Sequence, residues 1–199
     1  MFDSDESTVR AVQAGDTQAF ERLVNGHKDR VFAMLVRLTG DAQAAEELAH
    51  ETFVRAYRGL DGFRGDALFG TWLIQIAVHL ARDRVRERAR SRTVSLDALL
   101  ERDRDALVFA DSRPAYDPLS IVTERDVTER FESALKELPP SYREAFIMHH
   151  IEDMPYEAIA ETTGDTVGSL KVRVHRARKL LKDKLFPDAA RMAAGDILE

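Results

Sequence analysis

The 199-residue chain contains no cysteine, so its sequence excludes a disulfide framework and a metal site built on thiolates. Its longest strongly apolar stretch, 72–81, is interrupted by Gln75 and His79 and is too short to cross a bilayer. The first ten residues lack the basic segment and the following apolar run of a secretory signal. These absences lead us to expect a cytoplasmic protein.

The sequence also lacks the short motifs of the common enzyme classes. It contains no HExxH pattern, no phosphate-binding glycine loop and no nucleophile elbow. His149 and His150 lie beside Glu152 and Asp153, but neighbouring side chains of a helix point in different directions and do not easily share one metal ion. We therefore expect no enzymatic activity, no catalytic residue, no metal, no cofactor and no small-molecule substrate.

Long strand patterns are missing as well, because apolar residues recur at three- and four-residue steps almost throughout. This periodicity predicts helices over 20–40, 41–60 and 69–90. Between 92 and 120 the pattern fades and the charge is high, although a short helix is expected at 96–100. The N-terminal helices can pack into one helical domain.

The C-terminal part has clear helix boundaries. Ser141, followed three residues later by Glu144, is the capping-box pattern that predicts a helix to about residue 150. Pro155 fits the first turn of a short helix that ends at Gly164, and Thr166 can cap the last helix, to about residue 185. A short helix, a glycine turn and a longer basic helix together predict a helix-turn-helix.

The predicted fold is therefore all-α. It consists of two small helical domains joined by a flexible acidic linker, and the C-terminal domain is a helix-turn-helix. The expected boundaries are 1–92 for the first domain, 93–126 for the linker, 127–186 for the second domain and 187–199 for a short tail.

Charge is distributed very unevenly along the chain. The net charge of −6 argues by itself against a nucleic-acid partner. However, residues 72–92 carry six arginines against two acidic residues, and residues 165–184 carry seven basic residues against two acidic ones. The stretch 95–129 between them carries nine acidic and four basic residues. Two basic segments separated by an acidic connector favour two separate contacts with DNA.

The last helix supplies candidate DNA-reading residues. If Ile159 packs against Leu170 and Val174, a polar and basic face of this helix remains on the outer surface. Arginine can bind guanine O6 and N7 with two hydrogen bonds, and lysine or arginine can bind phosphates. The alternative is a solvated basic face on an ordinary helix. The candidates are Ser169, Lys171, Val172, Arg173, His175, Arg176 and Lys179.

Two blocks of the sequence resemble one known family. The C-terminal block contains LPPSYREAFIMHHIEDMPYEAIAE and TTGDTVGSLKVRVHRARKLLKDKL, and it resembles the promoter-reading helix-turn-helix of extracytoplasmic-function (ECF) sigma factors. The N-terminal block contains AAEELAHETFVRAYRGLDGFRGDALFGTWLIQIAVHLARDRVR, and it resembles the polymerase-binding and −10-reading region of the same family. The resemblance covers residues 18–88 and 127–185, in the family's order.

The resemblance implies a sigma factor that binds core RNA polymerase and promoter DNA. The helix-turn-helix candidates would then read the −35 element. The residues implied for docking on the β′ clamp helices are Glu46, Glu47, His50, Glu51 and Arg55. Those implied for the −10 element, where a flipped base is captured, are Phe63, Arg64, Phe69, Trp72, His79, Arg82 and Arg86.

His79 stands where many members of the family carry asparagine, so the preferred −10 base is open at this stage. The resemblance also implies a contact with the polymerase β flap and an anti-sigma factor as a further partner. Two other interpretations are an autonomous helix-turn-helix regulator that binds operators as a dimer, and an enzymatic or ligand-sensing domain joined to a DNA-binding tail. Both leave the N-terminal resemblance unexplained.

Overall fold

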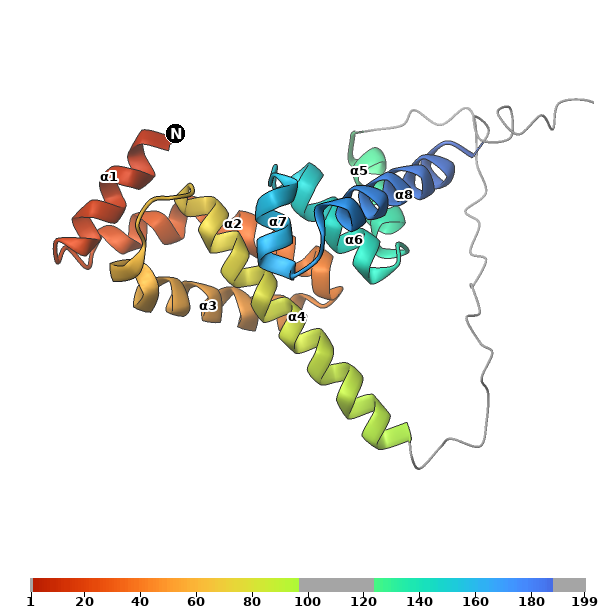
Figure 1. The fold of residues 1–199 in the computed structure, drawn as a ribbon, viewed down its shortest axis with the longest axis horizontal. Coiled ribbons are helices and arrows are strands. Elements are labelled where there is room, and N and C mark those ends of the chain that lie inside the picture. The colour runs from red at the N-terminus through yellow and green to blue at the C-terminus, as the bar shows by residue number, and fades with distance from the viewer. Residues whose placement is uncertain (1, 97–123, 188–199) are drawn as a thin grey trace, which may run out of the picture.

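The described residues fold almost entirely into helices joined by short turns. A computed structural model describes residues 2–96 and 124–187, and no strand occurs within those two ranges (Figure 1). The predicted all-α fold with two helical halves is therefore confirmed. Most of the predicted linker, part of the helix expected at 96–100 and nearly all of the tail lie outside the described residues.

The N-terminal half packs three long helices around one core. Its elements are α1 (Phe2–Gln13), α2 (Ala19–Thr39), α3 (Ala42–Gly59), a 3-10 turn η1 (Leu60–Gly62) and α4 (Phe69–Leu96). The sequence analysis did not anticipate α1, which packs against α2 and buries Val9. Large side chains that are almost completely buried here are Leu23, Met34, Leu35, Leu60, Leu73 and Ile74.

The boundary between α2 and α3 follows the sequence closely. Gly40 ends α2 in the left-handed conformation, with φ at 69°, which a glycine adopts without steric cost. Asp41 then caps α3, because its carboxylate accepts hydrogen bonds from the backbone N–H groups of Gln43 at 3.0 Å and Ala44 at 3.1 Å. These two residues set the direction in which α3 returns along α2.

The C-terminal half contains four helices and a π-helical turn. Its elements are α5 (Glu124–Lys136), α6 (Pro140–Phe146), the π turn η2 (Ile147–Ile151), α7 (Tyr156–Thr163) and α8 (Val167–Leu185). Its core contains Leu135, Ile147, Met148, Met154, Ile159 and Leu170, all with at most 2 % of their surface exposed.

The predicted capping box at Ser141 is wrong. α6 begins two residues earlier than predicted, with Pro139 and not Ser141 at the cap and Pro140 in the first turn, and no side chain caps it. Proline fits the first helical position because its missing N–H is not needed there. Ser141 therefore lies inside the helix, and Glu144 is free to contact Arg82 of the other half instead of its own helix start.

The predicted helix-turn-helix is confirmed, although Pro155 lies at the N-cap of α7 in an extended conformation and not in its first turn, where it was expected. Gly164 ends α7 with φ at 73°, and the Thr166 hydroxyl accepts a hydrogen bond from the Ser169 N–H at 3.2 Å to cap α8. Ile159 of α7 is fully buried and Leu170 and Val174 of α8 are nearly so, as their spacing predicted. The turn thus fixes α8 relative to α7.

The two halves are in contact with each other. α7 lies against α4, while α5 and α6 lie against α2 (Figure 1). The helix-turn-helix is therefore held beside the helix that carries the first arginine-rich segment. Among the described helices, none combines the length and apolar character needed to cross a membrane.

Thr166 caps its helix and Ser141 does not, so alanine variants of these two residues test the assignment of caps. We expect Thr166→Ala to lower the free energy of unfolding by about 1 kcal/mol, because it removes the acceptor that caps α8. Ser141→Ala should change it by less than about 0.5 kcal/mol, since Ser141 is exposed and caps nothing. Urea denaturation followed by circular dichroism measures both. Equal losses in the two variants would contradict this assignment of caps.

Candidate nucleic-acid interface

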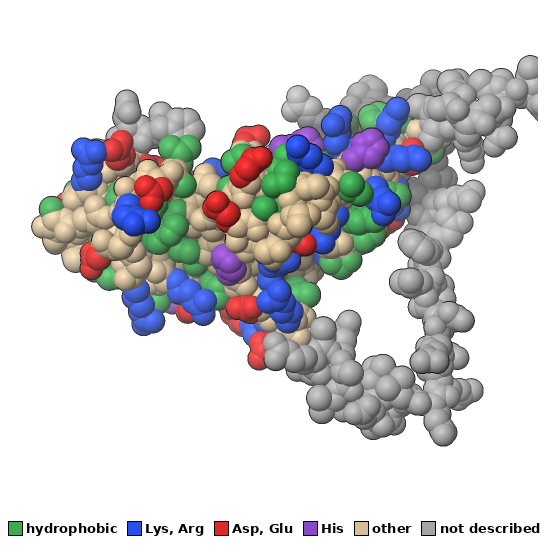
Figure 2. All heavy atoms as spheres, viewed as in Figure 1, with side chains coloured by type: hydrophobic (Ala, Val, Ile, Leu, Met, Phe, Trp, Pro, Cys, Tyr) green, Lys and Arg blue, Asp and Glu red, His purple; other side chains and the backbone are tan. Residues whose placement is uncertain are grey.

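All seven residues predicted to read the −35 element lie on α8. Figure 2 shows Lys, Arg and His side chains gathered over this helix. Ser169 is half-buried beside the cap, and Val172 is half-exposed at 50 %. A side chain with that exposure on a basic face suits contact with a thymine methyl group. The exposed basic members are Lys171, His175, Arg176 and Lys179.

Arg173 differs from Arg176 on the same helix, because its guanidinium is paired with a carboxylate, whereas Arg176 donates a hydrogen bond of 3.0 Å to the Tyr142 hydroxyl. Arg173 donates two hydrogen bonds of 2.8 Å to the two carboxylate oxygens of Asp165, in the turn before the helix. Burial alone would raise the pKa of Asp165, but the hydrogen bonds and charge of Arg173, with smaller contributions from Thr163 and Arg82, lower that pKa overall. The carboxylate occupies the same two donors that a guanine edge or a phosphate would use.

Three aromatic rings of the predicted −10 set form one cluster beside the loop between η1 and α4. The centre of the Phe63 ring lies 4.9 Å from the centre of the Trp72 ring and 6.1 Å from the centre of the Phe69 ring. Phe69 is buried, with 4 % exposed, so in this structure its ring packs beneath the loop and does not present a face to a base. Phe63 and Trp72 are partly exposed, and Arg64 is fully exposed in a weak pair with Asp66.

Gln13 is a residue that the sequence analysis missed. From the end of α1, its side-chain amide donates hydrogen bonds to the carbonyls of Leu60 at 2.8 Å and Phe63 at 3.0 Å. These bonds fasten the loop that carries the predicted −10 residues. A polar residue at the end of an unrecognised helix gave no signal in the sequence, because its partners lie 47 and 50 residues away.

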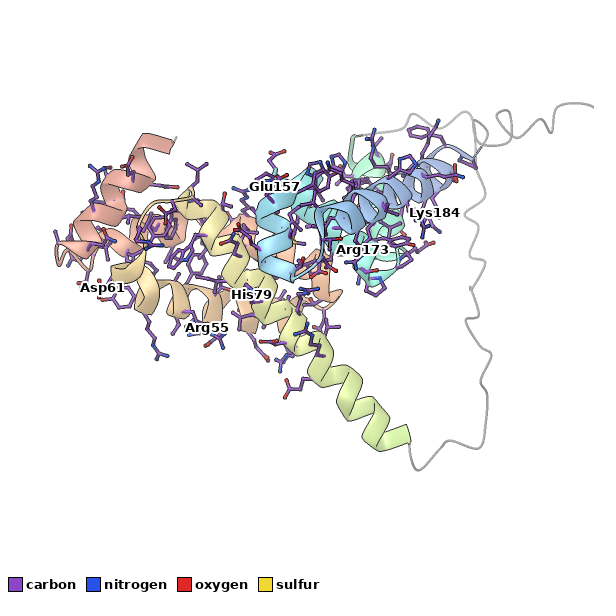
Figure 3. The ribbon with its side chains drawn as sticks, viewed as in Figure 1. Arg55, Asp61, His79, Glu157, Arg173 and Lys184 are labelled. Atoms are coloured by element: carbon purple, nitrogen blue, oxygen red, sulfur yellow. The ribbon has the colours of Figure 1, made fainter. Side chains whose placement is uncertain are left out.

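His79 projects from α4 on an exposed position, as its predicted role requires (Figure 3). Its Nδ1 lies 2.8 Å from the Gln75 carbonyl, which can only accept, so Nδ1 carries the hydrogen. In the neutral ring, Nε2 is then a hydrogen-bond acceptor turned to the outside. It could accept from an exocyclic amine of adenine or cytosine.

Arg82 and Arg86 lie one turn apart on α4 but in different surroundings. Arg86 is exposed and lies 3.6 Å from Asp83. Arg82 is largely covered, because it donates a hydrogen bond to the Thr163 carbonyl at 2.6 Å and lies 3.1 Å from the Glu144 carboxylate. Burial raises the pKa of Glu144, and the charge of Arg82 partly offsets that rise. The structure therefore does not leave Arg82 open to a phosphate.

The predicted polymerase-binding residues lie along one edge of α3. Glu46, Glu47 and His50 are exposed, and Arg55 donates a hydrogen bond of 2.7 Å to Glu51. Between this edge and α4 lies a groove of about 580 Å³ whose walls are mainly acidic. Arg84, in contact with Glu47, and Leu80 belong to it and were not among the predicted residues. Its lining is Glu47, Leu48, Glu51, Leu80, Asp83, Arg84 and Glu87.

A second groove, of about 460 Å³, lies between α5, the end of α6 and α8. Its lining is mostly apolar, with basic groups at the edge. Burial, followed by the nearby charges of His149 and Arg178, lowers the pKa of His150 in its wall. The sequence analysis did not find this groove, whose lining is Phe131, Phe146, His150, Arg178, Leu181, Lys182, Leu185 and Phe186.

The fold and these surfaces define a class of protein. It is a helical DNA-binding protein with a capped helix-turn-helix in one half, and with a loop of aromatic residues and an acidic groove in the other. Two family models match these halves separately. Sigma-70 region 2 matches residues 23–91, and Sigma-70, region 4 matches residues 128–181.

Proteins similar to the chain over nearly its whole length carry related names. The RNA polymerase sigma-H factor of Pseudomonas aeruginosa is 32% identical, over 93% of this chain and 95% of its own. The ECF RNA polymerase sigma factor SigE of Mycolicibacterium smegmatis is 35% identical, over 96% of this chain and 72% of its own. The chain belongs to the ECF family of RNA polymerase sigma factors. It therefore binds core RNA polymerase and directs promoter-specific transcription initiation, and such factors are DNA-binding proteins rather than enzymes.

Solved structures share the fold. The sigma factor RpoE from Bartonella quintana, in complex with the anti-sigma factor NepR, matches with a TM-score of 0.60 and 24% identity, over 85% of this chain and 98% of that one. CnrH in complex with the cytosolic domain of CnrY matches with a TM-score of 0.58 and 24% identity, over 93% of this chain and 99% of that one.

We expect His79→Asn to change the base preferred at one position of the −10 element. In the neutral histidine Nε2 only accepts, whereas an asparagine amide both donates and accepts. Run-off transcription from promoters that carry each of the four bases at each −10 position measures the change. The same promoters with altered −35 bases are the control, since their ranking should not move. An unchanged preference at every −10 position would reject this role of His79.

We expect Gln13→Leu to slow promoter opening about fivefold, because the loop loses side-chain hydrogen bonds worth about 1 kcal/mol in total. Binding to a −35 duplex should not change. Gln18→Leu is the matched control, since Gln18 is exposed at the start of α2 and makes no capping hydrogen bond. The rate of permanganate reactivity at the −10 element measures opening. Equal rates for wild type and Gln13→Leu would show that α1 does not support the loop.

Proposed function

We propose that three surfaces of this sigma factor bind three different targets. The exposed side of α8 reads the −35 element, the loop after η1 together with α4 reads and holds the −10 element, and the groove between α3 and α4 docks on the polymerase. The observation that carries this proposal is the row of exposed basic residues on a helix whose start is fixed by a capped turn.

At the −35 element, α8 lies in the major groove. Ser169, Lys171 and Arg173 lie nearest its N-terminal end, and Val172 contacts a thymine methyl group. Arg176 and Lys179 hold phosphates further along, with His175 beside them. Arg173 must exchange its two hydrogen bonds with Asp165 for bonds to DNA.

At the −10 element, a flipped base stacks on the rings of Phe63 and Trp72, where each stacked base gains about 1–3 kcal/mol. Phe69 holds those rings from below, and His79 reads a base edge through Nε2. Arg64 and Arg86 hold the backbone of the melted strand, and Arg82 joins them once the two halves separate.

The acidic groove binds the β′ clamp helices through Glu46, Glu47 and Glu51, with His50 and Arg55 at its edge. Leu48 and Leu80 give it an apolar floor, which is the composition expected of a specific interface with a charged rim. The apolar groove beside Phe131 and Phe186 is the surface that suits the β flap, since it lies on the C-terminal half and is large enough for an apolar segment.

An anti-sigma factor is a further partner of this chain in our proposal. The two structural relatives above are complexes of sigma factors with NepR and with CnrY, and the present chain shares their fold. We also propose that the protein acts in the cytoplasm, where its polymerase partner is. The domain boundaries 1–92, 93–126, 127–186 and 187–199 remain part of this proposal.

Arg173 and Lys179 test the −35 assignment as a pair. We expect Arg173→Ala to weaken binding by about 1–3 kcal/mol on the preferred −35 sequence, and much less on a sequence with the contacted base changed. Lys179→Ala should weaken binding uniformly and reduce the salt dependence by one phosphate contact. Holoenzyme binding to a set of −35 variants at several salt concentrations measures both.

Run-off transcription with the same holoenzyme preparations tests the proposed function as a whole. Purified core polymerase with this chain should produce run-off transcripts that core polymerase alone does not make. A uniform loss for Arg173→Ala would mark it as a phosphate contact and not a base reader. No stimulation on a promoter selected with the holoenzyme would contradict the assignment of these surfaces.

A further inference from the structure

Two tyrosines from outside α8 contact basic side chains of that helix. The Arg176 guanidinium donates a hydrogen bond of 3.0 Å to the hydroxyl oxygen of Tyr142, which lies on α6. The ammonium group of Lys171 lies over the ring of Tyr156, the first residue of α7, at 5.7 Å from the ring centre. Neither tyrosine belongs to the surface assigned to the −35 element, but each contacts a residue of that surface.

Lys171 and Arg176 mark the two borders of the exposed side of α8. An α-helix turns by about 100° per residue, so five positions separate these two side chains by about 140° around the axis. His175, Lys179 and Val172 fall inside that arc. The buried residues of the helix lie on the opposite side, and they are Leu170, Val174, Ala177 and Leu181. The two tyrosines therefore contact the edges of the surface that faces away from the core.

Packing fixes the positions of both tyrosine rings. The rings of Tyr142 and Tyr156 are partly buried and pack against the hydrophobic core. The Tyr156 ring is also stacked on the His149 ring, with 4.0 Å between the ring centres. His149 is held in turn, because its Nδ1 donates to the Met154 carbonyl at 3.0 Å. The contacts to Lys171 and Arg176 therefore come from side chains that are themselves held in place.

The partners of Lys171 and Arg176 are neutral, whereas the partner of Arg173 is charged. Asp165 accepts both hydrogen bonds of Arg173 and must be displaced before that arginine contacts DNA. A phenol oxygen occupies a single N–H donor of Arg176, and a ring face occupies no hydrogen-bond acceptor site that Lys171 needs. Lys171 and Arg176 thus keep their charge and their remaining donors for a phosphate or a base edge.

The ordering of long side chains is one of the costs of DNA binding. Lysine and arginine populate many rotamers in solution, and a side chain that is immobilised in an interface loses that freedom. A contact that already exists in the free protein removes part of this loss, so that affinity increases without any new contact to DNA.

We propose that Tyr142 and Tyr156 are positioning residues for −35 recognition, which hold Arg176 and Lys171 in their DNA-binding directions without neutralising them. This inference rests on the assignment of α8 to the −35 element under the proposed function. Each tyrosine acts through its basic partner and not through a contact of its own with DNA. Its effect must therefore disappear when that partner is absent.

Removal of the Tyr142 hydroxyl tests the first contact. Tyr142→Phe keeps the packed ring and deletes only the acceptor of Arg176. We expect the affinity of the holoenzyme for a promoter with the preferred −35 sequence to fall about two- to fivefold. The salt dependence of binding should keep its wild-type slope, because Arg176 still reaches its phosphate. In an Arg176→Ala background the same substitution should have no further effect.

Removal and replacement of the ring test the second contact. Tyr156→Leu deletes the ring face under Lys171 and should weaken the same binding about two- to fivefold, whereas Tyr156→Phe keeps a ring face and should recover most of that loss. Tyr156→Leu should have no further effect in a Lys171→Ala background. Tyr57→Phe is the matched control, since Tyr57 is 45 % exposed on α3 in the other half, and it should leave binding unchanged.

Thermal unfolding shows whether each variant is folded, and Tyr142→Phe removes no packed atom except the hydroxyl oxygen. Unchanged affinity in folded Tyr142→Phe or Tyr156→Leu, or a loss that persists in the alanine backgrounds, overturns the positioning role. Weaker binding by Arg176→Ala and Lys171→Ala leaves the proposed function intact in that case. If these two alanine variants themselves bind as the wild type does, the assignment of α8 to the −35 element is wrong.

Discussion

The pairing of Arg82 with the turn of the helix-turn-helix is the interaction on which the described arrangement depends. A guanidinium this well covered needs acceptors, and the C-terminal half provides a carbonyl and two carboxylates. Because one of those carboxylates also holds Arg173, the position of α7 against α4 and the position of the reading side chain on α8 are coupled. The same electrostatic requirement is repeated at Arg30, whose partner Glu152 directly follows η2, and at Arg37, whose partner Glu132 lies on α5.

This coupling explains how an acidic protein can be a DNA-binding protein. The chain has a net charge of −6, yet α4 and α8 each carry a dense run of basic residues, and Glu144 and Asp165 are placed against Arg82 and Arg173. In the structure these acids and arginines neutralise one another within the molecule. The acidic groove is a separate surface, lined by residues of α3 and α4.

The sequence predicted those parts of the structure that depend on neighbouring residues. Gly164 and Thr166 act within one helical turn, so the end of α7 and the cap of α8 could be derived from position alone. The predicted boundary at 40/41 agrees with Gly40 and Asp41. Ser141 shows how a local rule can fail, because Pro139 and Pro140 start the helix before the capping box can act.

The contacts of the site could not be derived in the same way. Arg82 reaches Thr163 across 81 residues, and Gln13 reaches Leu60 and Phe63 across 47 and 50. A residue type indicates what a side chain can bind, but only the packing of the halves decides which partner it meets. For that reason the sequence predicted Arg82 and Arg173 as DNA contacts without revealing that acids of the same chain already bind them.

A distance measurement between the two halves, with and without core polymerase, tests the central claim most directly. The chain has no cysteine, so Arg58→Cys on α3 and Asp183→Cys on α8, both exposed, can carry a pair of spin labels. The account predicts one short distance in the free protein and a longer one, by tens of ångströms, in the holoenzyme bound to a promoter. The same distance in both states, or a long distance already in the free protein, would contradict it.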